Sequence, residues 1–237
     1  MERTDRLWPD GPLFYFDDSL FAPGTDSFLL ASFTRTRSGE RVCDLGAGTG
    51  LLGLLLLARQ PELELHNVEI QEAALALAEK TYAANGIAAA QHHADLRALD
   101  GILSPGSFNL VISNPPYFKA GSGQQAATAA RQTAREENTC TVDDLCRAAA
   151  RLLRWGGRFS VVYRPERLTD LLCAMRKYGM EPKRLRMVQN TASAAPSLIL
   201  VEGKRGGKSG LVIEPPLILK TADGSESADY RAAYFRN

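Results

Sequence analysis

A glycine-rich turn between a short apolar run and a leucine-rich run constrains this chain more than any other feature. Residues 41–45 are mostly apolar and include Asp44 near their end, Gly46, Gly48 and Gly50 follow directly, and the next eight residues carry leucines at helical spacing. Strand, tight turn and helix in direct succession predict a cofactor loop of a parallel α/β sheet. Glycine allows positive φ and removes the β-carbons that would keep a ligand from the backbone, while Asp44 can accept from a cationic or amine group.

The spacing of these glycines separates two cofactors. A dinucleotide fingerprint needs G-x-G-x-x-G, with the helix N-terminus directed at a pyrophosphate. Here the third glycine comes one residue early, as G-A-G-T-G, and an acid precedes the loop, which disfavours NAD. The D-x-G-x-G-x-G pattern resembles motif I of class I S-adenosylmethionine (SAM) methyltransferases. That resemblance implies that Asp44 faces the methionine ammonium of SAM and that Leu45, Ala47 and the three glycines surround the cofactor.

Acidic residues also end the next two predicted strands. Glu69 closes the alternating run 63–69, 19 residues beyond the glycine loop, where a carboxylate suits both ribose hydroxyls of SAM or NAD. Ile70 comes directly after it and can pack on the adenine. Asp95, followed by Leu96, comes after a third strand, and its carboxylate can accept from the adenine amine. Because ligands bind at the carboxyl ends of parallel strands, we expect these side chains to meet at one edge of the sheet.

The segment before the glycine loop is a predicted cover for the cofactor. A Pro-Gly-Thr-Asp sequence ending in Thr25 and Asp26 opens the apolar stretch 28–33, which predicts a helix with one of these two residues as its N-cap. In several SAM enzymes an element preceding motif I closes over the cofactor. Thr25 and Asp26 are therefore candidate cofactor-binding residues, although a plain helix cap explains them equally well.

The sequence Asn114-Pro115-Pro116-Tyr117-Phe118 directly follows the fourth predicted strand and carries the predicted chemistry. The exocyclic amine of adenine is a poor nucleophile because its lone pair is delocalised into the ring. If the Asn114 side-chain oxygen and the Pro115 carbonyl both accept from that amine, the nitrogen can pyramidalise and direct its lone pair at a methyl group. Prolines fix φ and lack an N–H donor, so these acceptors are preorganised. Tyr117 or Phe118 offers a ring on which a flipped base can stack.

The remaining pattern predicts further αβ alternation. Helices are expected at 71–84, 141–155 and 165–178, with Thr141 opening the second in a capping-type pattern. The expected strands are 88–94, 108–113, 158–163, and segments near 183–188 and 198–202. Residues 217–219 and 230–235 form a short tail.

Composition restricts compartment and partners. At 237 residues with 45% hydrophobic residues, the chain can bury one α/β core. No apolar run approaches the ~18 residues of a membrane span, and the N-terminus lacks a signal pattern, so we expect a cytoplasmic protein without a membrane partner. The four cysteines lack CxxC spacing, which predicts reduced thiols and no metal site.

Positive charge is concentrated in the second half of the chain. Residues 1–110 carry 8 Lys/Arg against 15 Asp/Glu, whereas residues 111–237 carry 20 against 12. The segment Lys204-Arg205-Gly206-Gly207-Lys208 reads as a basic loop. Lys204, Arg205 and Lys208 are therefore predicted to contact RNA phosphates, alongside the stacking residues Tyr117 and Phe118.

Taken together, the chain resembles the bacterial tRNA1(Val) adenine-37 N6-methyltransferases. Beyond the two motifs, the likeness includes residues 21–26, 134–136, 164–168, 181–186 and 215–218. It implies a Rossmann-like class I SAM methyltransferase with a mostly parallel seven-stranded sheet and helices on both faces. It also implies a single domain, in which residues 1–39 close over SAM, 40–205 form the core and 206–237 a tail, and it implies a tRNA anticodon-loop substrate.

Other functions stay open at this point. Related proteins with the same tetrapeptide methylate a guanine N2 in ribosomal RNA or a glutamine amide, and the amine chemistry at Asn114 would serve either substrate. A SAM-fold protein that binds RNA with weak turnover is a third possibility, although it would not need an amine acceptor at Asn114. The oligomeric state does not follow from the sequence.

Overall fold

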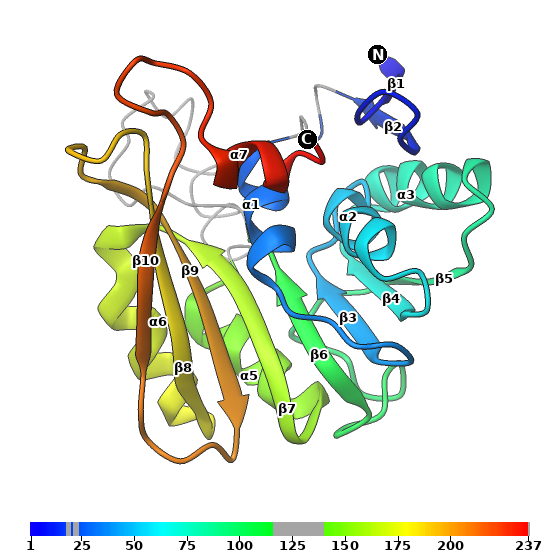
Figure 1. Cartoon of the computed structure of the whole chain (residues 1–237). Helices are drawn as coiled ribbons and strands as arrows, with labels where there is room; N and C mark the ends of the chain where they lie inside the picture. The colour runs from blue at the N-terminus through cyan, green and yellow to red at the C-terminus, as the bar shows by residue number, and fades with distance from the viewer. Residues whose placement is uncertain (18–19, 21–23, 116–139, 237) are drawn as a thin grey trace, which may run out of the picture.

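An eight-stranded sheet forms the centre of the computed structural model, which describes residues 1–17, 20, 24–115 and 140–236 (Figure 1). The strand order is β10-β8-β9-β7-β6-β3-β4-β5. The strands pair in parallel except that β9 runs antiparallel to β7 and β8. The bounds are β3 Arg41–Leu45, β4 Glu64–Glu69, β5 Ala89–His93, β6 Phe108–Ser113, β7 Leu153–Tyr163, β8 Met180–Gln189, β9 Pro196–Arg205 and β10 Val212–Ile218.

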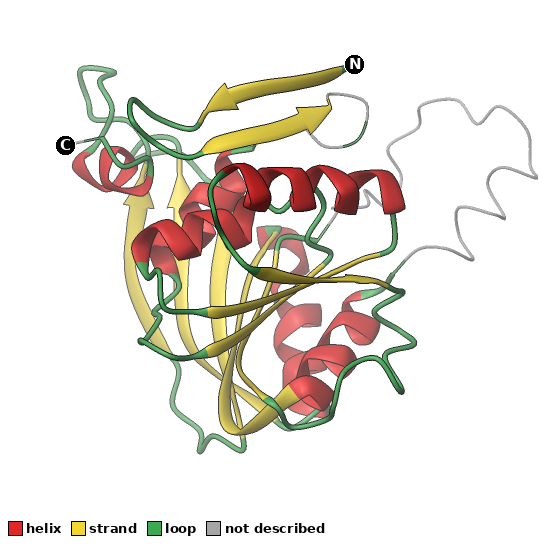
Figure 2. Cartoon of the chain, turned by 90° about the vertical axis from the view of Figure 1, so that its right-hand side faces the viewer, coloured by secondary structure: helices red, strands yellow, loops and turns green. Residues whose placement is uncertain are grey.

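Helices cover both faces of this sheet and enclose two apolar clusters (Figure 2). One cluster includes residues of α1 (Thr25–Phe33), α2 (Leu51–Arg59), α3 (Glu72–Ala84) and α7 (Ala228–Ala233). The other includes residues of α5 (Val142–Leu152) and α6 (Leu168–Lys177), which follows the short helix η1 (Pro165–Arg167). Val42 joins the first cluster and Cys43 the second, because successive strand residues point to opposite faces.

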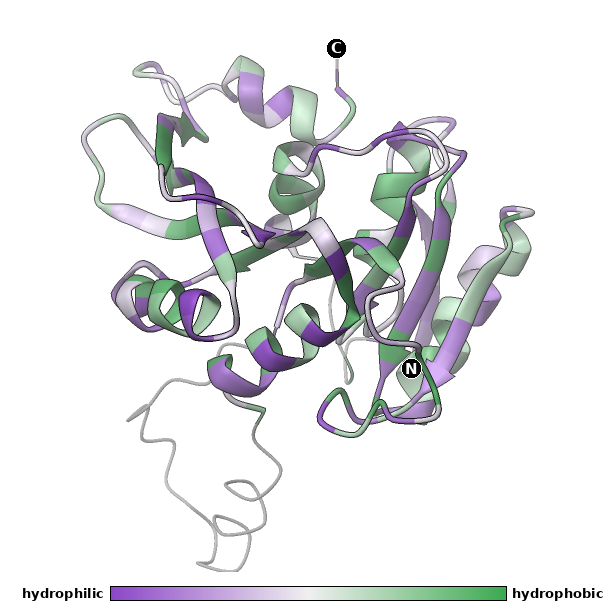
Figure 3. Cartoon of the chain, turned by 90° about the horizontal axis from the view of Figure 1, so that it is seen from below, coloured by the Kyte–Doolittle hydropathy of each residue, from purple (hydrophilic) through white to green (hydrophobic). Residues whose placement is uncertain are grey.

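The predicted α/β alternation is confirmed, and α5 shows why it forms. The Thr141 hydroxyl accepts from the Asp144 N–H at 3.1 Å, and the Asp144 carboxylate accepts from the Thr141 N–H at 3.1 Å, which completes the predicted capping box. Figure 3 shows hydrophobic and hydrophilic residues alternating along the helices, as one buried face requires. The expected end of this helix at Trp155 is wrong, because β7 begins at Leu153 and contains Gly156 and Gly157.

The expectation of seven strands is also wrong, since residues 212–218 add β10 at the edge of the sheet. Among the described strands, β10 pairs with β8 alone, in parallel, and the pairing shifts between Glu214 and Leu217. Pro215 and Pro216 occupy that interruption. Proline has no N–H to donate to a neighbouring strand, and an edge strand tolerates this because one of its sides has no neighbour. The adjacent prolines hide the strand pattern in the sequence, so the segment was expected to be part of a tail.

The N-terminal hairpin contacts both α3 and the C-terminal segment. A hairpin of β1 (Glu2–Arg6) and β2 (Leu13–Asp17) binds α3, where the Tyr15 N–H donates to Thr81 Oγ1 at 3.0 Å. Trp8 stacks on Phe235 near the C-terminus at 3.9 Å. None of the helices in the described ranges is long and apolar enough to cross a membrane.

Two glycines near the start of α2 are required by packing against α3. A β-carbon on Gly53 would lie 2.6 Å from Leu65 Cδ2 and 2.6 Å from the Tyr82 hydroxyl, and one on Gly50 would lie 2.9 Å from Ala78 Cβ. The Tyr82 hydroxyl donates to the Gly50 carbonyl at 2.8 Å. The buried tyrosine thus holds the end of the glycine loop against α3.

Gly53→Ala should therefore lower the free energy of unfolding by about 1–3 kcal/mol, because overpacking outweighs the gain in helix propensity. In a Tyr82→Phe background Gly53→Ala should lower the free energy of unfolding by less, because the hydroxyl that clashes with the new β-carbon is absent. Urea denaturation of the four proteins in this double-mutant cycle measures both quantities. A stabilising Gly53→Ala, or identical costs in the two backgrounds, would contradict this packing account.

Candidate functional site

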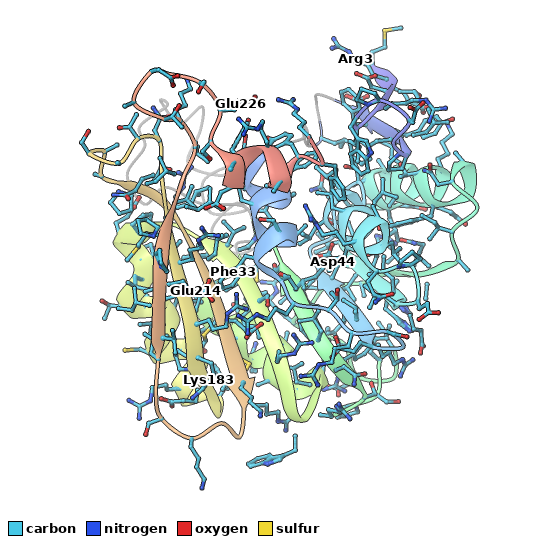
Figure 4. The ribbon with its side chains drawn as sticks, in the orientation of Figure 1. Arg3, Phe33, Asp44, Lys183, Glu214 and Glu226 are labelled. Atoms are coloured by element: carbon cyan, nitrogen blue, oxygen red, sulfur yellow. The ribbon has the colours of Figure 1, made fainter. Side chains whose placement is uncertain are left out.

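A cavity of about 330 Å³ lies where the carboxyl ends of β3, β4 and β6 meet. After β3 the chain continues to β4 on one side, whereas β6 pairs with β3 on the other, and ligands bind at such a reversal of strand order. Figure 4 labels Asp44 at this end of β3. Eight of the predicted cofactor residues line the cavity together with Asn114, which is predicted both to contact the cofactor and to carry the chemistry: Asp44, Gly46, Ala47, Gly48, Glu69, Ile70, Asp95 and Leu96.

The glycine loop leaves open space on the cavity side. Gly46 and Gly48 have φ of +73° and +55°, and a β-carbon on either would meet nothing within 4 Å. The N–H groups of Gly46 and Ala47 donate to the Val68 carbonyl of β4 at 2.9 and 3.1 Å, which holds the loop to the sheet. The first two glycines of the motif thus provide ligand space, whereas Gly50 serves the contact with α3.

Asp44 is the most unusual group of the site. Its side chain is 1% exposed, and neither carboxylate oxygen has a hydrogen-bond partner in the part of the chain that the structure describes. Burial, followed by repulsion from Glu69, raises the pKa of Asp44 to about 8, and the nearby Gly53 backbone lowers it only partly. A buried acceptor pair without a partner fits the ammonium of a SAM methionine group, which supplies both charge and N–H donors.

Glu69 shapes the loop as well as the cavity. Its Oε2 accepts from the Gly48 N–H at 2.8 Å and its Oε1 from the Gln71 N–H at 2.9 Å. Each carboxylate oxygen can accept more than one hydrogen bond, so the fixed carboxylate keeps capacity for a ribose diol. Ile70 follows it and is 53% exposed, an apolar surface beside the cavity that suits an adenine ring.

The Asp95 carboxylate, which was predicted to accept from the adenine amine, already accepts hydrogen bonds from Arg97. The Arg97 Nη2 and Nε donate to Asp95 Oδ2 at 2.6 and 2.9 Å, and the Arg97 backbone N–H donates to Oδ1 at 2.8 Å. These hydrogen bonds hold the pKa of Asp95 below its usual value. An adenine amine would share this carboxylate with Arg97, which also lines the cavity.

Asn114 follows β6 directly and borders the cavity. Its Nδ2 donates to the Ser27 hydroxyl of α1 at 3.0 Å. Pro115 is half-buried next to it. The other predicted catalytic and stacking residues, Pro116, Tyr117 and Phe118, lie outside the described residues.

Four predicted cofactor residues do not line the cavity. Leu45 is fully buried in the apolar core, and Gly50 packs on α3. Thr25 accepts from the Tyr234 hydroxyl of the C-terminal segment at 3.0 Å, and Asp26 lies in the first turn of α1. Neither caps that helix, because its N-cap is Gly24.

The cavity also contains residues that the sequence analysis did not single out. Thr49 is 1% exposed, and its hydroxyl has no hydrogen-bond partner among the described residues, which suits a polar atom of a ligand. Its place inside the glycine motif could have marked it. Ser27 and Arg97 carried no such signal, because only the fold brings them to the strand ends. No group of three or more His, Cys, Asp or Glu in the described ranges is arranged to hold a metal ion.

The three predicted basic RNA contacts, Lys204, Arg205 and Lys208, lie away from this cavity. Ser113, the residue before Asn114, pairs with Val161 of β7. Lys204 pairs with Arg158, which lies three residues earlier in β7 and therefore further from the carboxyl ends of the strands. The Lys183 Nζ donates to the Lys208 carbonyl at 3.0 Å, and Figure 4 labels Lys183 towards the opposite edge of the sheet from Asp44. Lys204 and Arg205 end β9 instead of belonging to a loop.

Comparison with known proteins agrees with this geometry. The family model described as methyltransferase small domain matches residues 21–175. A protein from Tolumonas auensis named tRNA1(Val) (adenine(37)-N6)-methyltransferase is 33% identical over 214 residues, which is 88% of this chain and 86% of that protein. A protein of the same name from Dickeya chrysanthemi is 31% identical over 88% of this chain and 84% of its own length.

Solved structures share the fold. A protein from Agrobacterium tumefaciens, described as a predicted O-methyltransferase, has a TM-score of 0.72 at 21% identity, covering 90% of this chain and 98% of that one. The T. thermophilus 16S rRNA N2 G1207 methyltransferase, in complex with AdoMet and guanosine, has a TM-score of 0.61 at 19% identity over 86% of this chain and 50% of that one.

The fold and the site together define a class I methyltransferase, an enzyme whose methyl donor is SAM. The chain belongs to the methyltransferase small domain family. The expected fold class, enzyme class and cofactor are thereby confirmed, with eight strands in place of seven.

The raised pKa of Asp44 predicts that ligand binding depends on pH. Between about pH 6 and pH 7.5, binding of S-adenosylhomocysteine (SAH) should release close to one proton, and its Kd should fall with rising pH by up to about tenfold per unit. The reason is that Asp44 must ionise to pair with the ammonium. Calorimetry in buffers of different ionisation enthalpy measures the proton release.

Two controls isolate the carboxylate. Asp44→Asn should remove most of the pH dependence, and 5′-methylthioadenosine, which has no ammonium, should bind the wild-type protein with a nearly constant Kd. If SAH binding released no proton in this range, Asp44 would not be the group that receives the ammonium.

Proposed function

We propose that this enzyme transfers the methyl group of SAM to N6 of adenine 37 in tRNA1(Val). The observation that carries the proposal is the match to relatives of that name over most of both chains. The position of Asn114 supports it, because this amide directly follows β6 and borders the cavity that fits SAM. A planar exocyclic amine is the substrate group for which such an acceptor is suited.

The chain's own residues account for the chemistry without a strong base. When bound, SAM supplies a methyl group activated by a positively charged sulfur. The Asn114 Oδ1 and the Pro115 carbonyl accept from the adenine amine, so that the nitrogen can become pyramidal and its lone pair, no longer delocalised into the ring, can attack the methyl group. The methylated nitrogen is cationic and releases a proton to solvent. The described residues that line the cavity include neither His nor Lys. A general base is not needed, because the amine becomes acidic once it is methylated and then loses its proton.

The cofactor would be held by groups of different kinds. Asp44 and the Thr49 hydroxyl receive the amino-acid part of SAM, Glu69 the ribose and Ile70 the adenine. We further propose that residues 1–39 cover the cofactor, since Leu20 and Ser27 line the same cavity.

Transfer of a deuterated methyl group tests the proposed reaction. The purified protein, incubated with methyl-deuterated SAM and an unmodified tRNA1(Val) transcript, should yield labelled N6-methyladenosine on nucleoside mass spectrometry. A transcript with adenine 37 replaced by guanosine should stay unlabelled. Labelled N2-methylguanosine, or label found only on a protein glutamine, would replace the adenine assignment with one of the alternatives.

Asn114→Ala separates chemistry from cofactor binding. Because the amide acts on the nitrogen as it pyramidalises, kcat should fall by about 10²–10³-fold, whereas the Kd for SAH should change little. Single-turnover methylation and calorimetry measure the two effects. A wild-type rate in this variant would rule out the role assigned to Asn114.

We also propose that RNA contacts extend to the basic residues at the far edge of the sheet. A second cavity of about 440 Å³ there is lined by Trp155, which is 79% exposed, together with Arg176 and Arg205. Lys204 extends from β9 beside it. In the strand register Ser113 is level with Val161 and Val201, and Lys204 lies three residues further along β9, roughly 10 Å, so one RNA can reach both sites.

Removing two of these charges tests this contact. The Lys204→Ala/Lys208→Ala variant should bind full-length tRNA more weakly and flatten the dependence of log K on log salt by roughly two units. Arg205 is left in place because its guanidinium donates to the Leu153 carbonyl and supports β7. Lys80→Ala serves as the matched lysine control. An unchanged salt slope would leave these lysines as ordinary surface charges.

A further inference from the structure

The first turn of α1 brings a buried hydroxyl to the predicted catalytic amide. Ser27 is 2% exposed, and its Oγ lies 3.0 Å from Asn114 Nδ2, which donates to it. Both residues line the cavity, although 86 residues separate them in the chain. A polar contact of this kind inside a ligand cavity invites a functional explanation, because most serines on helices face solvent or their own backbone.

The orientation of the Asn114 amide decides whether it can act. The oxygen and nitrogen of a carboxamide lie at opposite ends of one plane, so a nitrogen directed at Ser27 leaves the oxygen directed elsewhere. A flipped amide would present N–H donors to a substrate amine that also carries N–H groups, and no hydrogen bond would form. The productive orientation is therefore the one in which Ser27 accepts.

The position of Ser27 is itself fixed by the C-terminal segment. The Tyr234 hydroxyl donates to Thr25 Oγ1 at 3.0 Å, and the Tyr234 ring stacks on Phe28 at 4.1 Å with an interplanar angle of 3°. These contacts hold the residues on both sides of Ser27. A hydroxyl on a helix turn fixed in this way can orient a neighbouring side chain, as preorganised sites require.

We propose that Ser27 is a positioning residue for methyl transfer. By accepting from Asn114 Nδ2, it turns Asn114 Oδ1 towards the place of the substrate amine. This inference rests on the proposed function, since it assumes that Asn114 accepts from an amine. It assigns Ser27 no contact with the reacting atoms.

Kinetics of two Ser27 variants distinguish positioning from packing. Ser27→Ala should lower kcat about 10–100-fold, with KM for tRNA and Kd for SAH within about twofold of wild type. Ser27→Thr keeps the hydroxyl and should recover most of the lost rate. Ser32→Ala is the matched control on α1, because the Ser32 hydroxyl donates only to its own helix, at the Leu29 carbonyl, and its substitution should leave kcat unchanged.

A spectroscopic readout tests the inference independently of activity. In the SAH complex, the Asn114 side-chain amide, assigned by its loss in Asn114→Asp, should give two well-separated proton resonances in a ¹⁵N correlation spectrum. In Ser27→Ala these should move closer together and exchange faster with water, and Ser27→Thr should restore them. If Ser27→Ala leaves kcat and these resonances unchanged, or if Ser27→Thr loses as much rate as Ser27→Ala, Ser27 does not orient Asn114. An absence of RNA methylation in every protein, with the resonance changes intact, would reject the proposed function alone.

Discussion

A buried carboxylate without a protein partner is the constraint around which this site is built. Asp44 sits at 1% exposure at the end of β3, and its oxygens receive no hydrogen bond from the described residues. An unpaired buried charge is costly, so the group stays protonated until about pH 8. Because its pKa is higher in the folded protein than the usual value near 4, the contribution of Asp44 to the free energy of unfolding is greatest below about pH 4. That contribution decreases as pH rises and is lost once pH passes about 8. A cationic ligand would offset that penalty, so we expect the cavity to favour one.

The rest of the site depends on contacts between distant parts of the chain. The glycine loop is tied to β4 through Val68 and Glu69, so the two strand ends form one ligand surface. On the other side of the cavity, α1 is held by the C-terminal segment through Tyr234 and presents Ser27 to Asn114. In the proposed mechanism, cofactor binding and amine orientation rest on different elements, so we expect substitutions to separate them.

The sequence predicted the parts of the site that depend on local pattern. Asp44, Glu69 and Asn114 follow strands whose carboxyl ends must meet in a parallel sheet, and the structure places all three at one cavity. What escaped prediction depends on tertiary contact. Ser27 and Arg97 reach the cavity only through the packing of α1 and the turn after β5, and β10 is hidden by its two prolines. The sequence groups the basic residues near Lys204 by charge, but only the strand register reveals that Lys204 lies towards the opposite strand ends from Asn114.

The central claim is that Asp44 is protonated in the free protein and ionises when it receives the ammonium of SAM. Direct titration of its carboxyl carbon by NMR, assigned through Asp44→Asn, tests this claim in the free protein and in the SAH complex. The account predicts a midpoint near pH 8 in the free protein, and a carboxylate that stays ionised down to at least about two units lower in the complex. An ordinary midpoint near 4 in the free protein, or a midpoint that SAH leaves unchanged, would contradict it.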